Sequence, residues 1–120
     1  MSALTPDPKT LLPLPTATFH ILMALAEGDR HGYAIIQSVA ERSRGAMKLG
    51  AGTLYRSLQR MIDQGLVRES DTRPAAKDDD ERRRYYRLTP FGGAVARAEA
   101  DRLAALVKLA RASGFLTQRS

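Results

Sequence analysis

The chain has 120 residues, of which 43% are hydrophobic and 27% are charged, and its 19 basic and 13 acidic residues give a net charge of +6. This length supports one domain with a modest core. The sequence has no cysteine, which excludes disulfides, thiolate metal sites and a cysteine nucleophile. Since no apolar run reaches membrane-spanning length and the N-terminus lacks a signal pattern, we expect a cytoplasmic protein. The excess of positive charge favours a polyanionic partner.

The charge is distributed unevenly along the chain. Residues 41–60 hold five basic side chains and one acidic, residues 61–80 hold three and six, and residues 81–120 hold nine and three. Two basic blocks therefore flank an acidic one. A charge that served solubility alone would not require this arrangement, so the blocks mark candidate binding surfaces.

The first half of the chain is predicted to be helical after an extended start. Residues 1–15 contain four prolines, which disfavour regular structure, and we expect an extended arm there. Thr16 is a candidate cap for a helix that ends at Glu27. A second helix is predicted from about His31 to Ser43. Its expected buried side chains are Tyr33, Ile36 and either Val39 or Ala40.

A third helix and two strands follow in the prediction. The helix begins near Gly50–Thr53 and ends at Gln64, before the breaker Gly65. The pattern then alternates, which predicts strands over 66–70 and 83–88. Tyr86 and Leu88 share one face of the second strand and are expected in the core. Residues 71–82, with a proline and five acidic side chains, are expected to form a long hairpin loop between the strands.

The last helix has a strong start signal. Thr89 can cap it, Pro90 suits its first position, and the Ala-, Leu- and Arg-rich sequence that follows favours helix to about residue 112. Three helices followed by a two-stranded wing are typical of a winged helix-turn-helix. We therefore expect a mainly α fold with a small β-wing, divided into an arm (1–15), a DNA-binding domain (16–89), a dimerisation helix (90–113) and a flexible tail (114–120).

One face of the third helix is apolar and the opposite face is polar. Leu54, Leu58, Met61 and Ile62 fall on one stripe at 100° per residue and must face the core. Simple solvation would explain the polar face, but arginine, glutamine and threonine are side chains that read DNA bases. We therefore favour DNA reading over a solvated face. The candidate residues of this helix are Gly52, Thr53, Arg56, Gln59 and Arg60.

Residues on either side of this helix are candidates for contacts with the DNA backbone. Lys48 lies in the preceding loop, and Arg82, Arg83 and Arg84 open the second strand. Such contacts give affinity without sequence preference. The three arginines have an equally weighted alternative, which is pairing with the acidic residues 78–81. Tyr55 lies at the border of the core and DNA faces, so packing and phosphate contact are both open.

A heptad-like seam of apolar residues follows the last helix, with spacings of three and four residues. The seam could pack onto the first helix of the same chain. However, a helix of this length would extend beyond so small a body, and a twofold partner would cover it. We therefore expect a homodimer whose two reading helices meet successive major grooves of a pseudo-palindromic site. The seam residues are Gly93, Ala96, Ala100, Leu103, Val107 and Ala110, with Leu106 beside them.

Four short runs of residues form a composite pattern, at 31–35 (HGYAI), 52–58 (GTLYRSL), 65–67 (GLV) and 84–92 (RYYRLTPFG). In their order and spacing, these runs resemble the PadR family of bacterial transcription regulators. The similarity covers about residues 12–111 and matches the compact subfamily with one short C-terminal helix. Gly50-Ala51 departs from the family's usual Ser/Thr-Pro. The resemblance implies a dimeric repressor with the third helix in the major groove and an effector site near the dimer interface.

Other function classes find little support in the sequence. No spacing assembles a nucleophile with a base, and no glycine loop matches a phosphate cradle, so we do not expect an enzyme. His20 and His31 have no carboxylates arranged around them, so neither a metal site nor a cofactor is predicted. The expected function is a sequence-specific DNA-binding repressor, with double-stranded DNA, a second copy and an unidentified small-molecule effector as partners. The alternative is a winged-helix module that binds an acidic protein.

Overall fold

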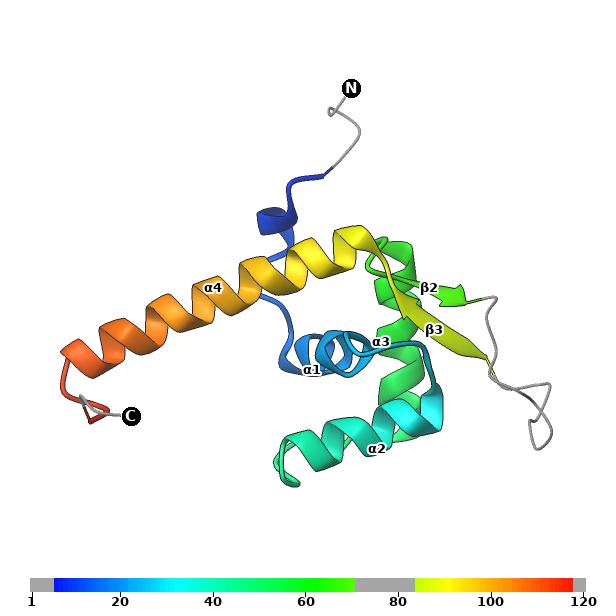
Figure 1. Cartoon of the computed structure of the whole chain (residues 1–120), viewed down its shortest axis with the longest axis horizontal. Helices are drawn as coiled ribbons and strands as arrows, with labels where there is room; N and C mark the ends of the chain where they lie inside the picture. Colours follow the sequence, from blue (N-terminus) through cyan, green and yellow to red (C-terminus); the bar gives the residue numbers. More distant parts are fainter. Residues whose placement is uncertain (1–5, 71–83, 118–120) are drawn as a thin grey trace.

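The computed structural model describes residues 6–70 and 84–117, and in these ranges the chain forms four α-helices, a short 3-10 helix and a three-stranded antiparallel sheet (Figure 1). The predicted class, mainly α with a small β-wing, is confirmed. The elements in chain order are η2 (Pro8–Leu11), α1 (Thr16–Leu25), β1 (Arg30–His31), α2 (Gly32–Arg42), α3 (Ala51–Asp63), β2 (Val67–Ser70), β3 (Tyr85–Leu88) and α4 (Pro90–Ala112).

The segment before α1 packs against the last helix. The Asp7 side chain caps η2 by accepting the Lys9 N–H at 2.9 Å. The Leu14 N–H donates to a carboxylate oxygen of Glu99 at 3.1 Å, and Glu99 is only 2% exposed. Arg102 holds the same carboxylate through two hydrogen bonds of 2.6 and 3.0 Å, which lower the pKa of Glu99. The buried charge is thus paired, and the N-terminal segment is fixed to α4.

The start of α1 differs from the prediction. Pro15, in extended conformation, takes the N-cap position that the sequence assigned to Thr16, and its carbonyl accepts the Phe19 N–H at 3.1 Å. The helix ends at Leu25, two residues before the predicted Glu27. The cap prediction is wrong because proline supplies the required extended backbone without any side-chain hydrogen bond.

The start of α2 is fixed by a histidine. The Nδ1 of His31 accepts the Ala34 N–H at 3.2 Å, so this side chain acts as the N-cap. The same residue ends β1, where it pairs with Tyr85 of β3. The helix therefore begins directly at the edge of the sheet.

The predicted buried face of α2 is partly wrong. Tyr33 is 61% exposed and Ile36 is half-buried, whereas Ile35 and Val39 are fully buried. Gly32 sets which face of α2 points to the core. It has no side chain, and it lies directly against Tyr55 of α3. Positions three and seven residues after Gly32 share its face, which puts Ile35 and Val39 in the core and Tyr33 outside.

The apolar stripe of α3 is where the sequence placed it. Leu54, Leu58 and Met61 are at most 1% exposed, and Ile62 is half-buried at the edge of the core. Gly50 occupies the N-cap without a side-chain hydrogen bond. Gly65 follows the helix with φ +81°, a left-handed backbone that favours glycine.

The sheet has the order β1-β3-β2, with β3 in the centre. Val67 lies opposite Leu88 and Ser70 opposite Tyr85, so β2 and β3 form the predicted wing. Tyr86 is buried and Leu88 packs against the core, as predicted. The sequence missed β1, since two residues are too few to show alternation. The predicted hairpin loop lies outside the described residues.

The connection between the wing and α4 brings two backbone segments into close contact. Thr89 caps α4 by accepting the Gly92 N–H at 2.8 Å, and Pro90 is the first helical residue, both as predicted. The Thr89 N–H and hydroxyl donate to the carbonyls of Leu66 and Gly65 at 3.1 and 2.6 Å. A Cβ on Gly92 would lie 2.1 Å from the Leu66 carbonyl oxygen, so only glycine fits there.

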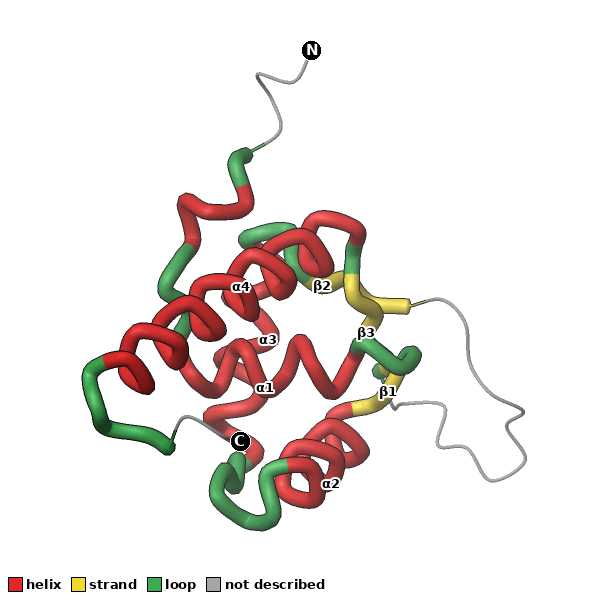
Figure 2. The backbone as a smooth tube through the Cα atoms, turned by 60° about the vertical axis from the view of Figure 1, so that its left-hand side comes forward, coloured by secondary structure: helices red, strands yellow, loops and turns green. Residues whose placement is uncertain are grey.

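The helices are layered around α1, which contacts α4 on one side and α2 on the other (Figure 2). Val95 of α4 and Ile21 and Leu22 of α1 are fully buried in this core. The C-terminal half of α4 extends away from the other helices (Figure 1). Within residues 6–70 and 84–117, no helix combines the length and hydropathy needed to cross a bilayer.

We predict that Gly92→Ala lowers the free energy of unfolding by about 2–3 kcal/mol, because the new methyl group overlaps a backbone carbonyl that cannot move aside. Gly52→Ala is the control, since its Cβ meets only the flexible end of Arg56 at 3.2 Å, and its effect should stay within about 1 kcal/mol. Urea unfolding of both variants measures the difference. Equal stabilities would contradict the close approach at Gly92.

Candidate nucleic-acid interface

The face of α3 opposite its buried stripe is polar and open to solvent. Because Leu54, Leu58 and Met61 fix the rotation of the helix in the core, the residues on the opposite side of the helix point outward. Gln59 Nε2 donates a hydrogen bond to the Asp63 carboxylate at 3.1 Å, so the one acidic side chain of this face already has a partner in the same helix. All five candidate residues of this helix are exposed: Gly52, Thr53, Arg56, Gln59 and Arg60.

Gly52 leaves room for the Arg56 side chain. The guanidinium of Arg56 folds back over the preceding turn, where a Cβ on residue 52 would lie 3.2 Å from Nη1. Both residues are exposed. A side chain at position 52 would therefore compete with Arg56 for the space at the start of α3.

The loop before α3 presents basic side chains. Lys48 and Arg44 are exposed, and Arg44 has φ +54° in the turn that ends α2. Ser43 holds this turn by accepting the Met47 N–H at 2.9 Å. Arg42 forms an ion pair with Glu27, which lowers the pKa of that carboxyl. Lys48 and Arg44 thus belong to the basic block that precedes α3 in the chain.

The wing contributes Arg84, which is exposed at the start of β3. Its guanidinium pairs with Glu69 of β2 at 3.4 Å, and both side chains are more than half exposed. An ion pair in such contact with water contributes little stability and separates readily. Arg82, Arg83 and the acidic residues 78–81 lie outside the described residues, so the pairing between them stays an untested alternative.

Tyr55 lies between α3 and the first turn of α2. The side chain is 49% exposed, and a Cβ on Gly32 would lie 2.1 Å from its hydroxyl. The hydroxyl end of the ring therefore packs on Gly32, while about half of the side chain stays exposed. A cavity of about 170 Å³ opens beside it, lined by His31, Gly32, Tyr33, Tyr55 and Arg84.

The first part of the predicted α4 seam lies beside α1 of the same chain. Gly93 and Ala96 are half-buried and Ala100 is exposed. Together with Phe19 and Met23 of α1, they line a mostly apolar groove of about 450 Å³. The intrachain alternative thus accounts for part of the seam, but the groove leaves this surface incompletely covered.

The second part of the seam is not covered in this way by any of residues 6–70 and 84–117. Leu103 and Ala110 are half-buried, whereas Leu106 and Val107 are 48% and 43% exposed. Figure 1 shows that this end of α4 extends beyond the other helices. Further exposed apolar side chains follow at the same end, namely Leu109, Phe115 and Leu116.

The model of the transcriptional regulator PadR-like family matches residues 21–98. The chain belongs to this family. The match includes the second half of α1, the helices α2 and α3, the wing and the first part of α4. PadR-like proteins are DNA-binding transcription regulators, which agrees with the helix and wing surfaces described above.

Two curated relatives match this PadR-like chain over part of its length. "Uncharacterized protein X" of Lysinibacillus sphaericus is 31% identical over 74 residues, which are 62% of this chain and 65% of the relative. A 37.1 kDa protein in transposon TN4556 of Streptomyces fradiae is 36% identical over 86 residues, 72% of this chain and 22% of the relative. The alignments thus span less than two thirds of both relatives.

Solved structures share the fold of the PadR-like chain. A PadR family transcription regulator from Clostridium difficile R20291 is 25% identical, with a TM-score of 0.68 over 81% of this chain and 96% of that one. The Bacillus subtilis PadR, solved in complex with operator DNA, is 21% identical, with a TM-score of 0.58 over 70% of this chain and 47% of that one. The second likeness shows the fold alone.

Asp29 attaches the wing of the PadR-like chain to the segment before β1. Its carboxylate accepts two hydrogen bonds from Arg87 of β3, at 3.2 and 3.0 Å, and one from the Ser70 hydroxyl of β2. The Arg87 bonds, followed by the Ser70 bond, lower the pKa of Asp29 below its ordinary 3.8. No local pattern indicates this cluster, because Ser70 and Arg87 lie 41 and 58 residues after Asp29 in the sequence.

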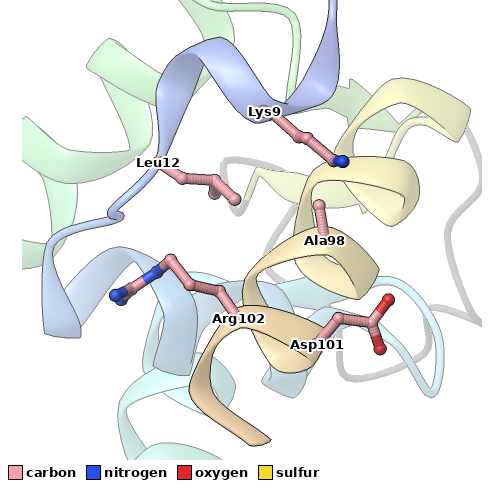
Figure 3. A pocket seen from close by; sticks show the side chains of 5 residues that line it. All are labelled: Lys9, Leu12, Ala98, Asp101 and Arg102. Carbon is pink, nitrogen blue, oxygen red and sulfur yellow. The ribbon is translucent and has the colours of Figure 1, made fainter. Parts of the chain in front are cut away.

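A second cavity of the PadR-like chain lies between η2 and α4 and has a volume of about 540 Å³ (Figure 3). Leu12 and Ala98 face each other across it, and Lys9 extends over α4. Arg102 and Asp101 also line it, and their charged ends point in opposite directions. An apolar body with a charged group would match this lining.

We predict that the carboxylate of Asp29 stabilises the wing at neutral pH and loses this effect in acid. Because its pKa is lower in the folded chain than in the unfolded chain, the stabilisation is complete above about pH 4–5 and disappears as the pH falls through the folded-state pKa. Asp29→Asn should lower the free energy of unfolding at pH 7 by about 1–2 kcal/mol and flatten its dependence below pH 4. Some dependence of stability on pH remains in the wild type and in the variant, because the pKa of Glu99 is also lowered in the folded chain.

The same change at exposed Asp101, Asp101→Asn, is the matched control and should leave the stability at pH 7 nearly unchanged. Urea unfolding at pH 3 to 7 gives both curves. Parallel curves for the wild type and Asp29→Asn would contradict the role of the carboxylate.

Proposed function

We propose that this PadR-like chain is a homodimeric repressor that binds a pseudo-palindromic operator through α3 and is released by an unidentified small-molecule effector. The exposed face of α3 carries this proposal. Arg56 and Arg60 can each donate two hydrogen bonds to a guanine, and Gln59 can read adenine. Their exposure on a helix held by a fully buried stripe makes them available to a major groove.

The flanking basic side chains fit backbone contacts on both sides of that groove. Lys48 lies before α3, and Arg84 lies at the start of the central wing strand. Their charges would release counterions from DNA and so make binding salt-dependent. Operator binding is also supported by the Bacillus subtilis PadR, whose fold this chain shares and which was solved on operator DNA. Arg82 and Arg83 are proposed as further contacts with the DNA backbone.

A homodimer is supported by the uncovered end of α4. Leu106, Val107 and Leu109 are each more than 40% exposed, and the end of the helix extends from the body. A second copy related by a twofold axis would cover the same residues on both chains. The two α3 helices would then read successive major grooves, about 34 Å apart, in the two halves of the operator.

Repression and release are the finer parts of the proposal. The resemblance to a family of repressors favours repression, because a dimer that occupies a promoter excludes the polymerase. The cavity between η2 and α4 gives an effector a place beside the dimerisation helix (Figure 3). An effector bound there would act on α4, since Ala98 and Arg102 belong to that helix.

The alternative function, a module that binds an acidic protein, uses the same basic surface. Titration of labelled promoter DNA at several salt concentrations distinguishes the two. A steep salt dependence with a preference for one palindromic sequence supports the regulator. Binding without sequence preference, or no binding, would exclude it.

Within that titration, we predict that Arg56→Ala weakens operator binding by roughly 1–3 kcal/mol and relaxes the preference at one base pair in each half-site. The reason is that the variant loses the guanidinium, which can donate two hydrogen bonds to the edge of one base. Lys48→Ala is the contrasting control, which should weaken binding equally to all sequences and reduce the salt slope. An unchanged base preference for Arg56→Ala would assign base reading to other residues.

We also predict that Val107→Glu and Leu103→Glu dissociate the dimer, with the dissociation constant raised roughly 100-fold or more, because an unpaired charge would be buried in the seam. Val107 is the cleaner site, since it is exposed in the single chain and outside its core. Lys108→Glu makes a larger charge change on the neighbouring exposed residue and should leave the dimer intact. Sedimentation equilibrium measures all three, and an intact dimer for both seam variants would remove the seam from the proposal.

A further inference from the structure

Tyr33 is an exposed tyrosine for which neither the core nor the exposed face of α3 gives a role. It lies in the first turn of α2 and is 61% exposed, more than any other tyrosine in the described chain. A ring exposed to this extent gains little stability from burial, so packing alone does not explain a tyrosine at this position. It lines the 170 Å³ cavity beside α3, together with Tyr55.

The geometry of α2 and α3 holds the second tyrosine at this cavity. The Tyr55 hydroxyl lies over Gly32 so closely that a side chain at position 32 would displace it. Within residues 6–70 and 84–117, neither the Tyr33 nor the Tyr55 hydroxyl forms a hydrogen bond. Two phenolic O–H groups are therefore available as donors at one opening.

Arg84 adds a positive charge to the same cavity. No acidic residue is among the described side chains that line it, so the lining consists of two hydroxyls, a guanidinium, an imidazole and a glycine. The Glu69 partner of Arg84 is itself exposed, and their ion pair can exchange for another anion at little cost. A cavity of donors without a carboxylate fits a small anion with several acceptor oxygens.

We propose that Tyr33, Tyr55 and Arg84 bind one phosphate of the DNA backbone. This inference rests on the proposed function and adds a contact that the reading face of α3 does not contain. The site joins the start of α2, the side of α3 and the wing, so a phosphate bound there is held by three elements at once. Such a contact sets the position of α3 in the groove and carries no base preference.

The experiment uses the full-length protein, the operator duplex and an unrelated duplex of equal length. Tyr33→Phe and Tyr55→Phe each remove one hydroxyl and should weaken binding to both duplexes by the same factor, roughly tenfold. Their salt slopes should equal that of the wild type, because a neutral donor is lost. Arg84→Gln should reduce the slope by about one for each protomer bound. Tyr85→Phe is the matched control, since Tyr85 lies next to Arg84 but does not line the cavity.

A second series identifies the phosphate itself. Operator duplexes that carry a single neutral methylphosphonate are titrated with the wild type and with Tyr33→Phe. We expect one position in each half-site where the substitution weakens the wild type but has little further effect on the variant, because both changes remove the same hydrogen bond.

Each outcome bears on one proposal. Unchanged affinity of Tyr33→Phe, or a change confined to one base pair, would overturn the phosphate site while leaving operator binding by the wild type in place. Additive losses at every methylphosphonate position would also overturn it. Failure of the wild type to prefer any duplex would instead reject the proposed function, and the two failures are therefore distinguishable.

Discussion

The contact of Gly92 with the Leu66 carbonyl determines how the two functional parts of the chain are oriented. At this point α3 has just ended, β2 begins, β3 has ended and α4 begins, and Thr89 joins them through its cap and its bonds to residues 65 and 66. Because no side chain fits between these backbones, the angle between α3 and α4 has little freedom. In a twofold dimer that angle sets the separation of the reading helices, and so the spacing of operator half-sites that the protein accepts.

Much of this arrangement could be predicted from local patterns in the sequence. The stripe of α3, the Thr89-Pro90 start of α4 and the alternation of β3 are each encoded within a few residues, and the structure confirms them. The predicted ends of α1 differ from the observed ends by two residues or fewer. The composite motif pattern also indicated the family to which the chain belongs.

The features that the sequence could not predict depend on contacts between distant segments. Tyr33 is exposed because Gly32 packs against a tyrosine 23 positions later, and nothing within α2 encodes that contact. The Asp29 cluster joins three segments across 58 residues. For the candidate interface, helical periodicity identified the exposed residues of α3, whereas Arg84 and the two tyrosines come together only through the tertiary fold.

Because Leu14 is hydrogen-bonded to Glu99, the part of α4 beyond Glu99 moves about this contact as a rigid arm. The helix is held at Gly92 and again at Glu99, and the stretch from Leu103 to Ala112 extends past this second support. Ala112 is 13 residues beyond Glu99, which is about 20 Å along a helix axis. A rotation of about 5° at the support would therefore move the tip by nearly 2 Å. A small displacement at η2 thereby becomes a larger displacement at the far end of α4. Close-packed side chains in an interface there would tolerate only a smaller shift.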